Sequence, residues 1–388
     1  MVFRQEDGMN LVIHDLSEKE WNEISADYEG WKVVSDNGEI GPCIGCFCCW
    51  RKTPGECVIK DGYDNMGALI HHADEVVVIS RYTYGGFSAF VKNVFDRCIG
   101  YVLPQFEVIK GETHHKRRYD EDKAFTFIFY GKDLNMEQKE SARQYVEAVC
   151  ANIRGHVEEL EFWERGEEIA PPERTPKAEP GSRVILNGSM RNVKGNSAKF
   201  ARKMKEQLKS NPEIIDLKNH MDDMTSLVRE LEETETLVLC MPLYVDGLPA
   251  QVIRLMETFR REYRGGKARI YLLANMGLYE SKQLKNLFEA VRQWCTEMDF
   301  EYCGGLGISA GELLGTLIGQ KPFDKSSNKK AIEGIARLAK AINHEVKMKD
   351  IYAEPHHFPR WLYIAIANTN WNRLAKKAGI KPKDLYQR

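Results

Sequence analysis

The chain contains two similar segments about one domain length apart, and this repeat limits the folds that it can adopt. Residues 76–97 read VVVISRYTYGGFSAFVKNVFDR, and residues 237–257 read LVLCMPLYVDGLPAQVIRLME. Each is a short apolar strand, followed by a loop with aromatic and glycine residues and by the start of an amphipathic helix. Units of this kind build a parallel sheet with helices on both faces. The repeat therefore predicts an α/β protein that arose by tandem duplication.

A stretch rich in proline and charge divides the chain of 388 residues. Residues 166–182, GEEIAPPERTPKAEPGS, show no apolar periodicity, which is typical of a linker. We expect a first domain over residues 1–165 and a second over residues 183–345. The last residues, 346–388, are aromatic and then basic. They predict a helical tail that packs its aromatic face on the body or on a second subunit.

Composition excludes several classes of protein. The net charge of −2 provides no basic field for a nucleic acid. No apolar run is long enough to span a membrane, and the polar start MVFRQEDGMN is unlike a signal peptide. We therefore expect a cytoplasmic protein with no membrane span. Five of its ten cysteines lie between Cys43 and Cys57, and in that compartment such a cluster indicates metal binding or redox chemistry rather than disulfides.

The second unit begins with a segment suited to binding a phosphate monoester. Residues 187–204, NGSMRNVKGNSAKFARKM, follow the strand RVIL and lead into a helix that starts near Ser197. Gly188 and Gly195 permit close backbone approach, and the N–H groups and dipole of the helix point back at the loop. There is no GK[ST] sequence, so this is not a Walker A loop. The residues expected to contact the anion are Ser189, Arg191, Asn196 and Ser197.

These motifs resemble a known family. GSMRNVKGNS followed by MPLYVDGLPAQVIRLME is similar to the GSxRxxGNS and PLYxxGLP loops of the flavodoxin-like NAD(P)H-dependent FMN reductases, and the match covers most of residues 183–345. The resemblance implies two tandem flavodoxin-like domains, FMN as cofactor and NAD(P)H as co-substrate. No catalytic side chain is needed, since the flavin carries the chemistry. By resemblance the FMN phosphate is held by Ser189, Arg191, Asn196 and Ser197, the isoalloxazine ring is lined by Pro242, Leu243, Tyr244, Val245, Asp246 and Gly247, and its far side is closed by Asn275, Met276 and Gly277.

The first unit carries a compact cysteine motif instead. Cys43, Cys46, Cys49 and Cys57 have the spacing C-x2-C-x2-C-x7-C, with Cys48 as an extra. Such spacing lets thiolates wrap an iron–sulfur cube. It resembles the iron–sulfur flavoproteins, in which the motif precedes a lysine–aspartate pair, here Lys60-Asp61. A 4Fe–4S cluster, a tetrahedral zinc site and reduced thiols without metal all stay open.

The first unit keeps the aromatic turn YTYGGFS but not the phosphate loop. The chain reads NLVIHDLSEKEWNEI at that place, where Ser17 and Glu20 predict a helix-capping box. Asp15 and its acidic neighbours would repel a phosphate, so we expect no independent FMN here. The turn would cover the flavin of the second unit or of a neighbouring subunit, as in a homo-oligomer. Residues 113–120, THHKRRYD, predict a solvated charge run or a contact to the nicotinamide nucleotide.

The favoured interpretation is a cytoplasmic FMN-dependent oxidoreductase. It would take hydride from NAD(P)H and pass electrons to a quinone, a nitro or azo compound, flavin or another small acceptor. One alternative is an iron–sulfur flavoprotein that transfers single electrons to a ferredoxin-like partner. The other is a non-enzymatic, thiol-rich binding protein that has lost its flavin, against which the intact GSMRNVKGNS loop argues.

Overall fold

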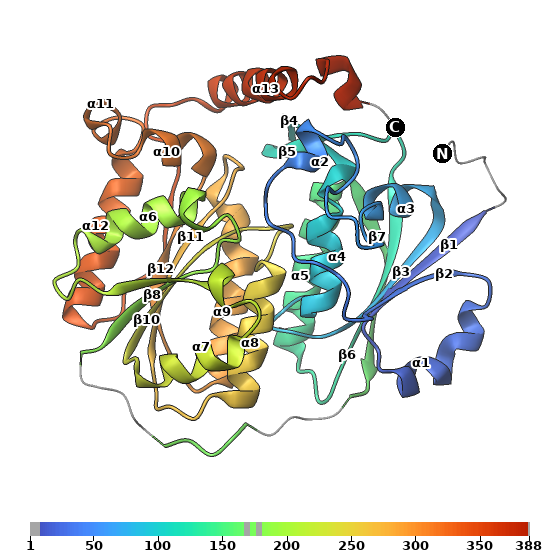
Figure 1. The fold of residues 1–388 in the computed structure, drawn as a ribbon, viewed down its shortest axis with the longest axis horizontal. Helices are drawn as coiled ribbons and strands as arrows, with labels where there is room; N and C mark the ends of the chain where they lie inside the picture. Colours follow the sequence, from blue (N-terminus) through green and yellow to red (C-terminus); the bar gives the residue numbers. More distant parts are fainter. Residues whose placement is uncertain (1–7, 167–170, 176–180, 387–388) are drawn as a thin grey trace. The chain divides into compact units, whose positions relative to one another are not determined.

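The computed structural model describes residues 8–166, 171–175 and 181–386. They form two compact units (Figure 1). The first unit comprises Met1–Glu107, His114–Glu168 and Ala367–Arg388, and the second comprises Val108–Thr113 and Ile169–Ile366. Of the predicted linker, residues 167–170 and 176–180 lie outside the described residues.

The first unit is built on a five-stranded sheet with the order β2-β1-β3-β6-β7, in which every pairing is parallel. Its strands are β1 (Met9–His14), β2 (Lys32–Ser35), β3 (Ala73–Arg81), β6 (Lys123–Gly131) and β7 (Gly155–Glu164). Its helices are α1 (Glu18–Ile24), α2 (Cys48–Arg51), α3 (Met66–His72), α4 (Ala89–Arg97) and α5 (Met136–Ile153). A two-stranded hairpin, β4 (Val102–Ile109) and β5 (Glu112–Arg117), follows α4.

Alternation along the strands gives this sheet two buried faces. Phe125, Phe127 and Phe129 of β6 lie on one face, where Phe95 of α4 and Tyr145 of α5 join the aromatic cluster through Phe87 and Phe125. The other face of β1, β3 and β6 packs with the end of α1 and with partly buried aromatic side chains. The helices therefore cover both faces of the sheet, as the sequence predicted.

The second unit repeats the architecture. Its parallel sheet has the order β13-β12-β11-β10-β8-β9. The strands are β8 (Arg183–Asn187), β9 (Glu213–Asp216), β10 (Thr236–Pro242), β11 (Arg269–Asn275), β12 (Glu301–Ile308) and β13 (Ile351–Ala353). The helices are α6 (Asn196–Lys205), α7 (Met224–Glu230), α8 (Ala250–Glu262), α9 (Lys285–Glu297), α10 (Gly311–Leu317), α11 (Lys321–Asp324) and α12 (Lys329–His344).

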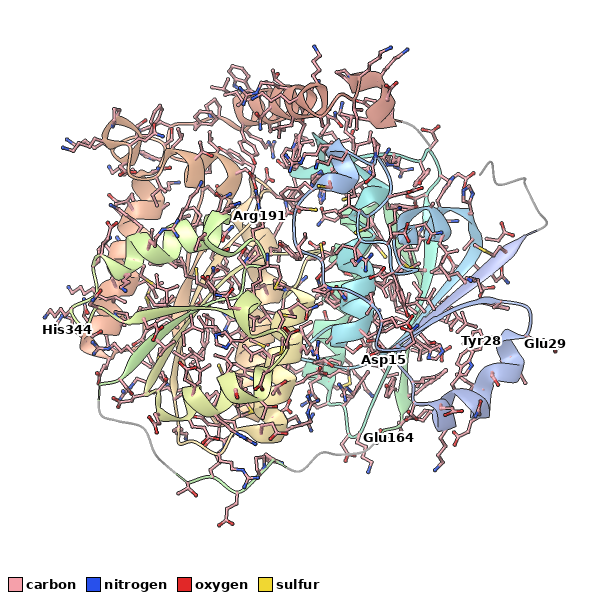
Figure 2. The ribbon with its side chains drawn as sticks, viewed as in Figure 1. Asp15, Tyr28, Glu29, Glu164, Arg191 and His344 are labelled. Atoms are coloured by element: carbon pink, nitrogen blue, oxygen red, sulfur yellow. The ribbon has the colours of Figure 1, made fainter. Side chains whose placement is uncertain are left out.

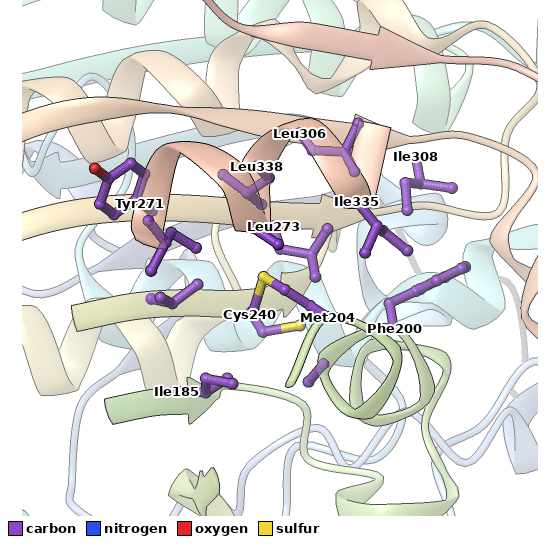
Figure 3. Close-up of a cluster of buried hydrophobic side chains, with 14 of the residues drawn as sticks. Ile185, Phe200, Met204, Cys240, Tyr271, Leu273, Leu306, Ile308, Ile335 and Leu338 are labelled. Carbon is purple, nitrogen blue, oxygen red and sulfur yellow. The ribbon is translucent and has the colours of Figure 1, made fainter. Parts of the chain in front are cut away.

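The core on one face of this sheet is shown in Figure 3. Phe200 and Met204 of α6 and Ile335 and Leu338 of α12 pack on side chains of the central strands, and all four are fully buried. Burying a side chain of this size stabilises the folded state by roughly 1.5–3 kcal/mol. This packing holds the N-terminus of α6 at the carboxyl edge of the sheet.

Counting strands in chain order, both sheets have the order 2-1-3-4-5, and the second sheet adds one strand at its edge. This is the flavodoxin-like arrangement, so the chain consists of two tandem flavodoxin-like units. The predicted tail contains α13 (Arg360–Lys377). Its Trp371 packs edge-on against Phe47 and Trp50, with ring centroids 5.5 and 5.3 Å apart, so aromatic packing of the tail on the body is confirmed. None of the described helices is long and apolar enough to cross a membrane.

Candidate functional site

The loop after β8 begins with a glycine that packs closely against β10 and α8. The Gly188 N–H donates to the Cys240 carbonyl at 2.8 Å, which ties the loop to β10. A Cβ on Gly188 would lie 2.7 Å from Cγ2 of Val252 and 3.3 Å from Cβ of Met241. A larger residue here would therefore force the Val252 side chain or the loop to shift. The next residue, Ser189, is buried, and its N–H donates to the Asn187 side chain at 3.2 Å.

Helix α6 begins at Asn196, within one residue of the predicted start. Its N-cap residue, Gly195, has no side chain and makes no side-chain cap hydrogen bond. The first N–H groups of a helix need acceptors, and they carry the positive end of its dipole. Ser189 and Arg191 precede this terminus on the same loop, and Arg191 is labelled in Figure 2. The arrangement suits an anion with several acceptor oxygens.

Two of the predicted flavin-contacting segments meet through one buried hydrogen bond. The Ser197 hydroxyl donates to the Asn275 side chain at 2.7 Å, and both side chains are buried. The Cys240 thiol donates to the Ser197 carbonyl at 3.1 Å. These contacts lock the start of α6 to the ends of β10 and β11. They also direct the hydroxyl of Ser197 to Asn275.

The loop after β10 is a tight turn. Tyr244 and Gly247 exchange backbone hydrogen bonds of 3.1 and 3.0 Å. Between them, Val245 and Asp246 have left-handed backbones, with φ values of 37° and 57°. The Leu243 N–H donates to the Asn275 carbonyl at 2.8 Å, so this turn and the end of β11 lie together. Pro242, at the end of β10, leads into the turn.

A fourth segment, residues 309–315, which includes the start of α10, completes this edge of the sheet, and the sequence analysis missed it. The Gly311 N–H donates to the Met276 carbonyl at 2.7 Å, and the Ala310 N–H donates to the Leu278 carbonyl at the same distance. A Cβ on Gly315 would lie 2.5 Å from Oδ1 of Asn196, so α10 approaches the start of α6 closely. Glycines four residues apart at the start of a helix were the available signal.

The start of α10 also contributes a charge. Glu312 Oε1 lies 3.5 Å from an Nη of Arg191, and both side chains are partly exposed. The predicted phosphate ligand therefore has a carboxylate beside it. The structure thus brings together three segments: Ser189 and Arg191 in the loop before α6 with Asn196 and Ser197 at its start, Pro242 to Gly247 after β10, and Asn275, Met276 and Gly277 after β11.

The same edge of the first sheet has a different first loop. The Asp15 N–H donates to the Ile79 carbonyl at 3.4 Å. The Asp15 carboxylate accepts from the Arg81 N–H at 3.0 and 3.2 Å, and it is hydrogen-bonded to Ser88. Burial raises the pKa of this carboxyl to about 6. The predicted capping box is confirmed, with reciprocal hydrogen bonds between Ser17 and Glu20 of 3.3 and 3.0 Å.

The aromatic turn, in contrast, is preserved. Thr83 and Gly86 exchange two backbone hydrogen bonds of 3.0 Å, and Tyr84 and Gly85 between them have φ values of 50° and 84°. Helix α4 begins three residues after this turn, just as α8 begins three residues after Gly247. The two units therefore share the turn and differ in the loop that precedes it.

The cysteine segment of the first unit packs on a polar face of α4. The Asn93 side chain accepts from the Cys43 N–H at 3.2 Å. Arg97 donates to the carbonyls of Gly41 and Ile59 at 3.1 and 2.9 Å and forms an ion pair with Asp61. Lys60, in contrast, pairs with acidic side chains at the surface.

Burial and neighbouring thiols raise the pKa of two cysteines of this segment, Cys43 and Cys49. Burial, together with the charges of Asp96, Cys57 and Cys46, raises the pKa of Cys43 to about 12. Burial also raises the pKa of Cys49, with added effects from Cys43, Cys46 and Cys57. Within the described ranges, however, no three His, Cys, Asp or Glu side chains form a group that could hold a metal ion. Ligation by Cys43, Cys46, Cys49 and Cys57 stays a prediction.

The segment predicted to be a solvated charge run or a nucleotide contact is largely a strand. Residues 113–117 belong to β5, and Thr113, His114 and Arg118 are buried. Arg118 donates to the carbonyls of Gly100 and Leu385, each at 2.6 Å. Its guanidinium therefore holds backbone groups inside the unit. The expectation of a solvated charge run is wrong for Thr113, His114 and Arg118, which are buried.

No family model matches the chain, but two curated proteins match parts of it. The chain is 32% identical over 77 residues to an iron–sulfur flavoprotein of Archaeoglobus fulgidus, a match that covers 20% of this chain and 34% of that protein. It is 39% identical over 59 residues to an iron–sulfur flavoprotein of Methanocaldococcus jannaschii, covering 15% and 30%. The chain thus spans about a third of the length of the curated relatives that it matches. These matches confirm the resemblance to iron–sulfur flavoproteins.

The similar solved structures are smaller proteins. A Trp repressor binding protein from Bacillus subtilis is 16% identical, with 40% of this chain and 96% of that chain covered and a TM-score of 0.33. An FMN-dependent NADH-azoreductase from Bacillus anthracis is 12% identical, with 42% and 99% covered and a TM-score of 0.31. An NAD(P)H:quinone oxidoreductase from Methanothermobacter marburgensis is 12% identical, with 46% and 98% covered and a TM-score of 0.31.

Proposed function

We propose that the chain is an FMN-dependent oxidoreductase that takes hydride from NAD(P)H and passes electrons to a small acceptor such as a quinone, a nitro or azo compound or a flavin. The observation that carries the proposal is the start of α6. There an N-terminus without a side-chain cap, the buried Ser189 and the cation Arg191 share one short loop. These groups fit a terminal phosphate.

The neighbouring loops fit a flat ring beside that phosphate. The Tyr244–Gly247 turn and the Asn275–Gly277 segment are joined by the hydrogen bond between Leu243 and Asn275. A Cβ on Gly277 would meet no atom within 4 Å, so the protein leaves open space at this residue. FMN, when bound, would supply the chemistry of accepting a hydride and of passing electrons on. The role of the chain is to bind the phosphate, orient the ring and offer backbone groups to its edge.

We assign one FMN to the second unit and none to the first. The Asp15 carboxylate takes the place of a phosphate-binding loop in the first unit, and a carboxylate repels a phosphate. We further propose a cytoplasmic protein that acts as a homo-oligomer, with domains over residues 1–165 and 183–345.

The second candidate is an iron–sulfur flavoprotein that exchanges single electrons with a ferredoxin-like protein. It is favoured by the effect of the nearby Cys46 and Cys57 thiols on the pKa of Cys43 and Cys49 and by the names of the curated relatives. The fit to a metal is weaker than the fit to FMN, since these side chains form no metal-binding group. A thiol-rich protein without flavin is the third reading.

One preparation separates the three candidates. Anaerobically purified protein is examined by absorption spectroscopy, flavin release and iron analysis. Resolved yellow bands with flavin and NAD(P)H oxidation, without iron, support the oxidoreductase. Additional broad brown absorption with about four irons supports the cluster protein. A preparation that neither retains nor rebinds FMN contradicts both, and leaves the binding protein.

A further inference from the structure

The loop that follows β11 is held in place by the segment that precedes α13 and by the first turn of that helix. The Tyr363 hydroxyl, which is buried, donates to the Gly277 carbonyl. In the other direction, the Tyr279 hydroxyl donates to the Phe358 carbonyl at 2.7 Å. The two tyrosine rings lie 5.7 Å apart.

Glu280 forms the centre of a second set of contacts to the same loop. Its carboxylate accepts from the Thr113 N–H at 2.7 Å and pairs with Arg360 at 2.8 Å, although Glu280 is only 8% exposed. The next residue, Ser281, donates through its N–H and its hydroxyl to Glu354, each at 3.1 Å. Charge-assisted hydrogen bonds of this kind are stronger than neutral ones.

These contacts determine the direction of peptide groups. The peptide bond is planar, so a Gly277 carbonyl held by Tyr363 also fixes the direction of the Leu278 N–H. The Leu278 carbonyl is held in turn by the Ala310 N–H. The backbone from Gly277 to Leu278 is therefore fixed, while the position of a Cβ on Gly277 is open.

The first unit treats the corresponding loop differently. After β6 the chain runs through residues 132–135 straight into α5, which Asn135 caps. There the Asp133 N–H donates to Glu164 at 3.0 Å, at the end of the neighbouring strand β7. The contacts between residues 277–281 and residues 354–363 are thus found in the unit for which we propose the anion-binding loop.

We propose that residues 354–363 form a latch that positions the loop 276–281, with Tyr363 as its main positioning residue. The proposal rests on the proposed function, because its purpose is to present the Gly277–Leu278 backbone to the flavin ring. Tyr363 acts through Gly277 and is not itself a contact of the reacting atoms.

The test uses the full chain with two matched tyrosine variants. Tyr363→Phe removes only the hydroxyl that binds Gly277. Tyr263→Phe is the control, because Tyr263 is equally buried in the same unit and its hydroxyl donates to the Gly266 carbonyl at 3.0 Å. Two quantities are measured: amide hydrogen exchange of residues 276–281 in flavin-free protein, and the dissociation constant for FMN.

We expect Tyr363→Phe to accelerate exchange in residues 276–281 several-fold and to raise the FMN dissociation constant about five- to tenfold, the usual effect of one lost hydrogen bond. Tyr263→Phe should leave both unchanged. Unaltered exchange in Tyr363→Phe, or equal weakening of FMN in both variants, overturns the latch. If the unsubstituted protein binds no FMN, the proposed function and the flavin role of the latch fail together. The exchange measurement in flavin-free protein still decides whether Tyr363 holds the loop.

Discussion

Asp15 occupies in the first unit the position that Gly188 occupies in the second. Each lies one residue beyond its strand, and each donates its N–H to the neighbouring strand, Asp15 to Ile79 and Gly188 to Cys240. The strand pairing gives the same equivalence, since His14 is paired with Ile79 and Asn187 with Cys240.

The neighbours of these two residues differ in a matching way. The carboxylate of Asp15 accepts from the N–H of Arg81 and is hydrogen-bonded to Ser88. The equivalent residues in the second unit are Pro242 and Pro249, which have no N–H and no hydroxyl to donate. The first unit thus has the acceptor Asp15 where Arg81 and Ser88 can donate to it. The second unit, whose two prolines cannot donate, has the closely packed Gly188 instead. In the first unit, Asp15 thus bonds to donors of its own unit at this edge.

Arg191→Ala should weaken FMN binding at least tenfold. Loss of a hydrogen bond to a charged group costs about 1.5–3 kcal/mol, and a titration of flavin fluorescence measures it. Arg202→Ala is the matched control, because Arg202 lies on α6, which follows the loop that holds Arg191, and it donates to the Val193 carbonyl in an exposed position. An unchanged affinity in Arg191→Ala would remove the phosphate assignment.

Flavin released by denaturation should approach one FMN per chain. The physical reason is the Asp15 carboxylate, which stands where the first unit would need a phosphate-binding loop. Flavin absorbance divided by the protein concentration from amino-acid analysis gives the ratio. A reproducible value of two would show that the first unit also binds FMN.

Asp15→Asn should change how stability depends on pH. Burial raises the pKa of Asp15 from 3.8 to about 6, so the folded state favours the protonated form. The protonated Asp15 therefore adds to the free energy of unfolding, and this contribution is complete below about pH 4. It is lost as the pH rises through 6, and the loss is about 3 kcal/mol at most.

Urea unfolding of both proteins between pH 4 and 7 measures this effect. Asparagine stays neutral, so the variant should gain stability relative to the original chain as the pH rises. A difference between the two proteins that is constant with pH would contradict the assignment.

Gly277→Ala should weaken FMN binding without affecting folding. A Cβ at this residue meets no protein atom within 4 Å, so the unfolding free energy should change by less than about 0.5 kcal/mol. A methyl group in the space assigned to the ring should raise the dissociation constant. In contrast, Gly188→Ala forces a Cβ against Val252 and should cost about 1–3 kcal/mol of stability. Full FMN affinity in Gly277→Ala would place the ring elsewhere.

Arg97→Met should destabilise the first unit by about 3 kcal/mol. The substitution leaves Asp61 without its ion-pair partner and the Gly41 and Ile59 carbonyls without their donor. Lys60→Met is the control from the same segment. Its ion pairs are at the surface, so it should cost at most about 1 kcal/mol. Urea denaturation followed by tryptophan fluorescence compares the two, and equal effects would refute a special role for Arg97.

Local patterns were sufficient to predict the two sheets and the start of α6. Apolar runs such as EVVVIS and TLVLCMP are central strands, where both faces are buried. The hairpin β4–β5 was missed because its buried polar groups depend on distant partners. Nδ1 of His114 lies 2.7 Å from Oδ1 of Asn152, and Arg118 donates to Leu385 near the end of the chain. No sequence window contains both members of these pairs.

The candidate site shows the same limit. Residue types and spacing identified the loops around Ser189, Tyr244 and Asn275, since each directly follows a strand. Two contacts of the site join segments that lie far apart in the chain. They are the hydrogen bond between Ser197 and Asn275 and the ion pair between Arg191 and Glu312. Only the folded structure reveals that the hydroxyl of Ser197 donates its hydrogen bond to the Asn275 side chain.

The two aromatic turns should not open with equal ease. Val245 is β-branched and has a φ of 37°, while the equivalent pair in the first unit is Tyr84 and Gly85. A left-handed β-branched residue carries roughly 1–3 kcal/mol of backbone strain. Under rising denaturant the Val245–Asp246 turn is therefore expected to lose its hydrogen bonds before the Tyr84–Gly85 turn does. The second unit thus keeps a strained turn at the edge of the sheet where Ser189, Arg191 and the start of α6 lie, the segment for which we propose phosphate binding.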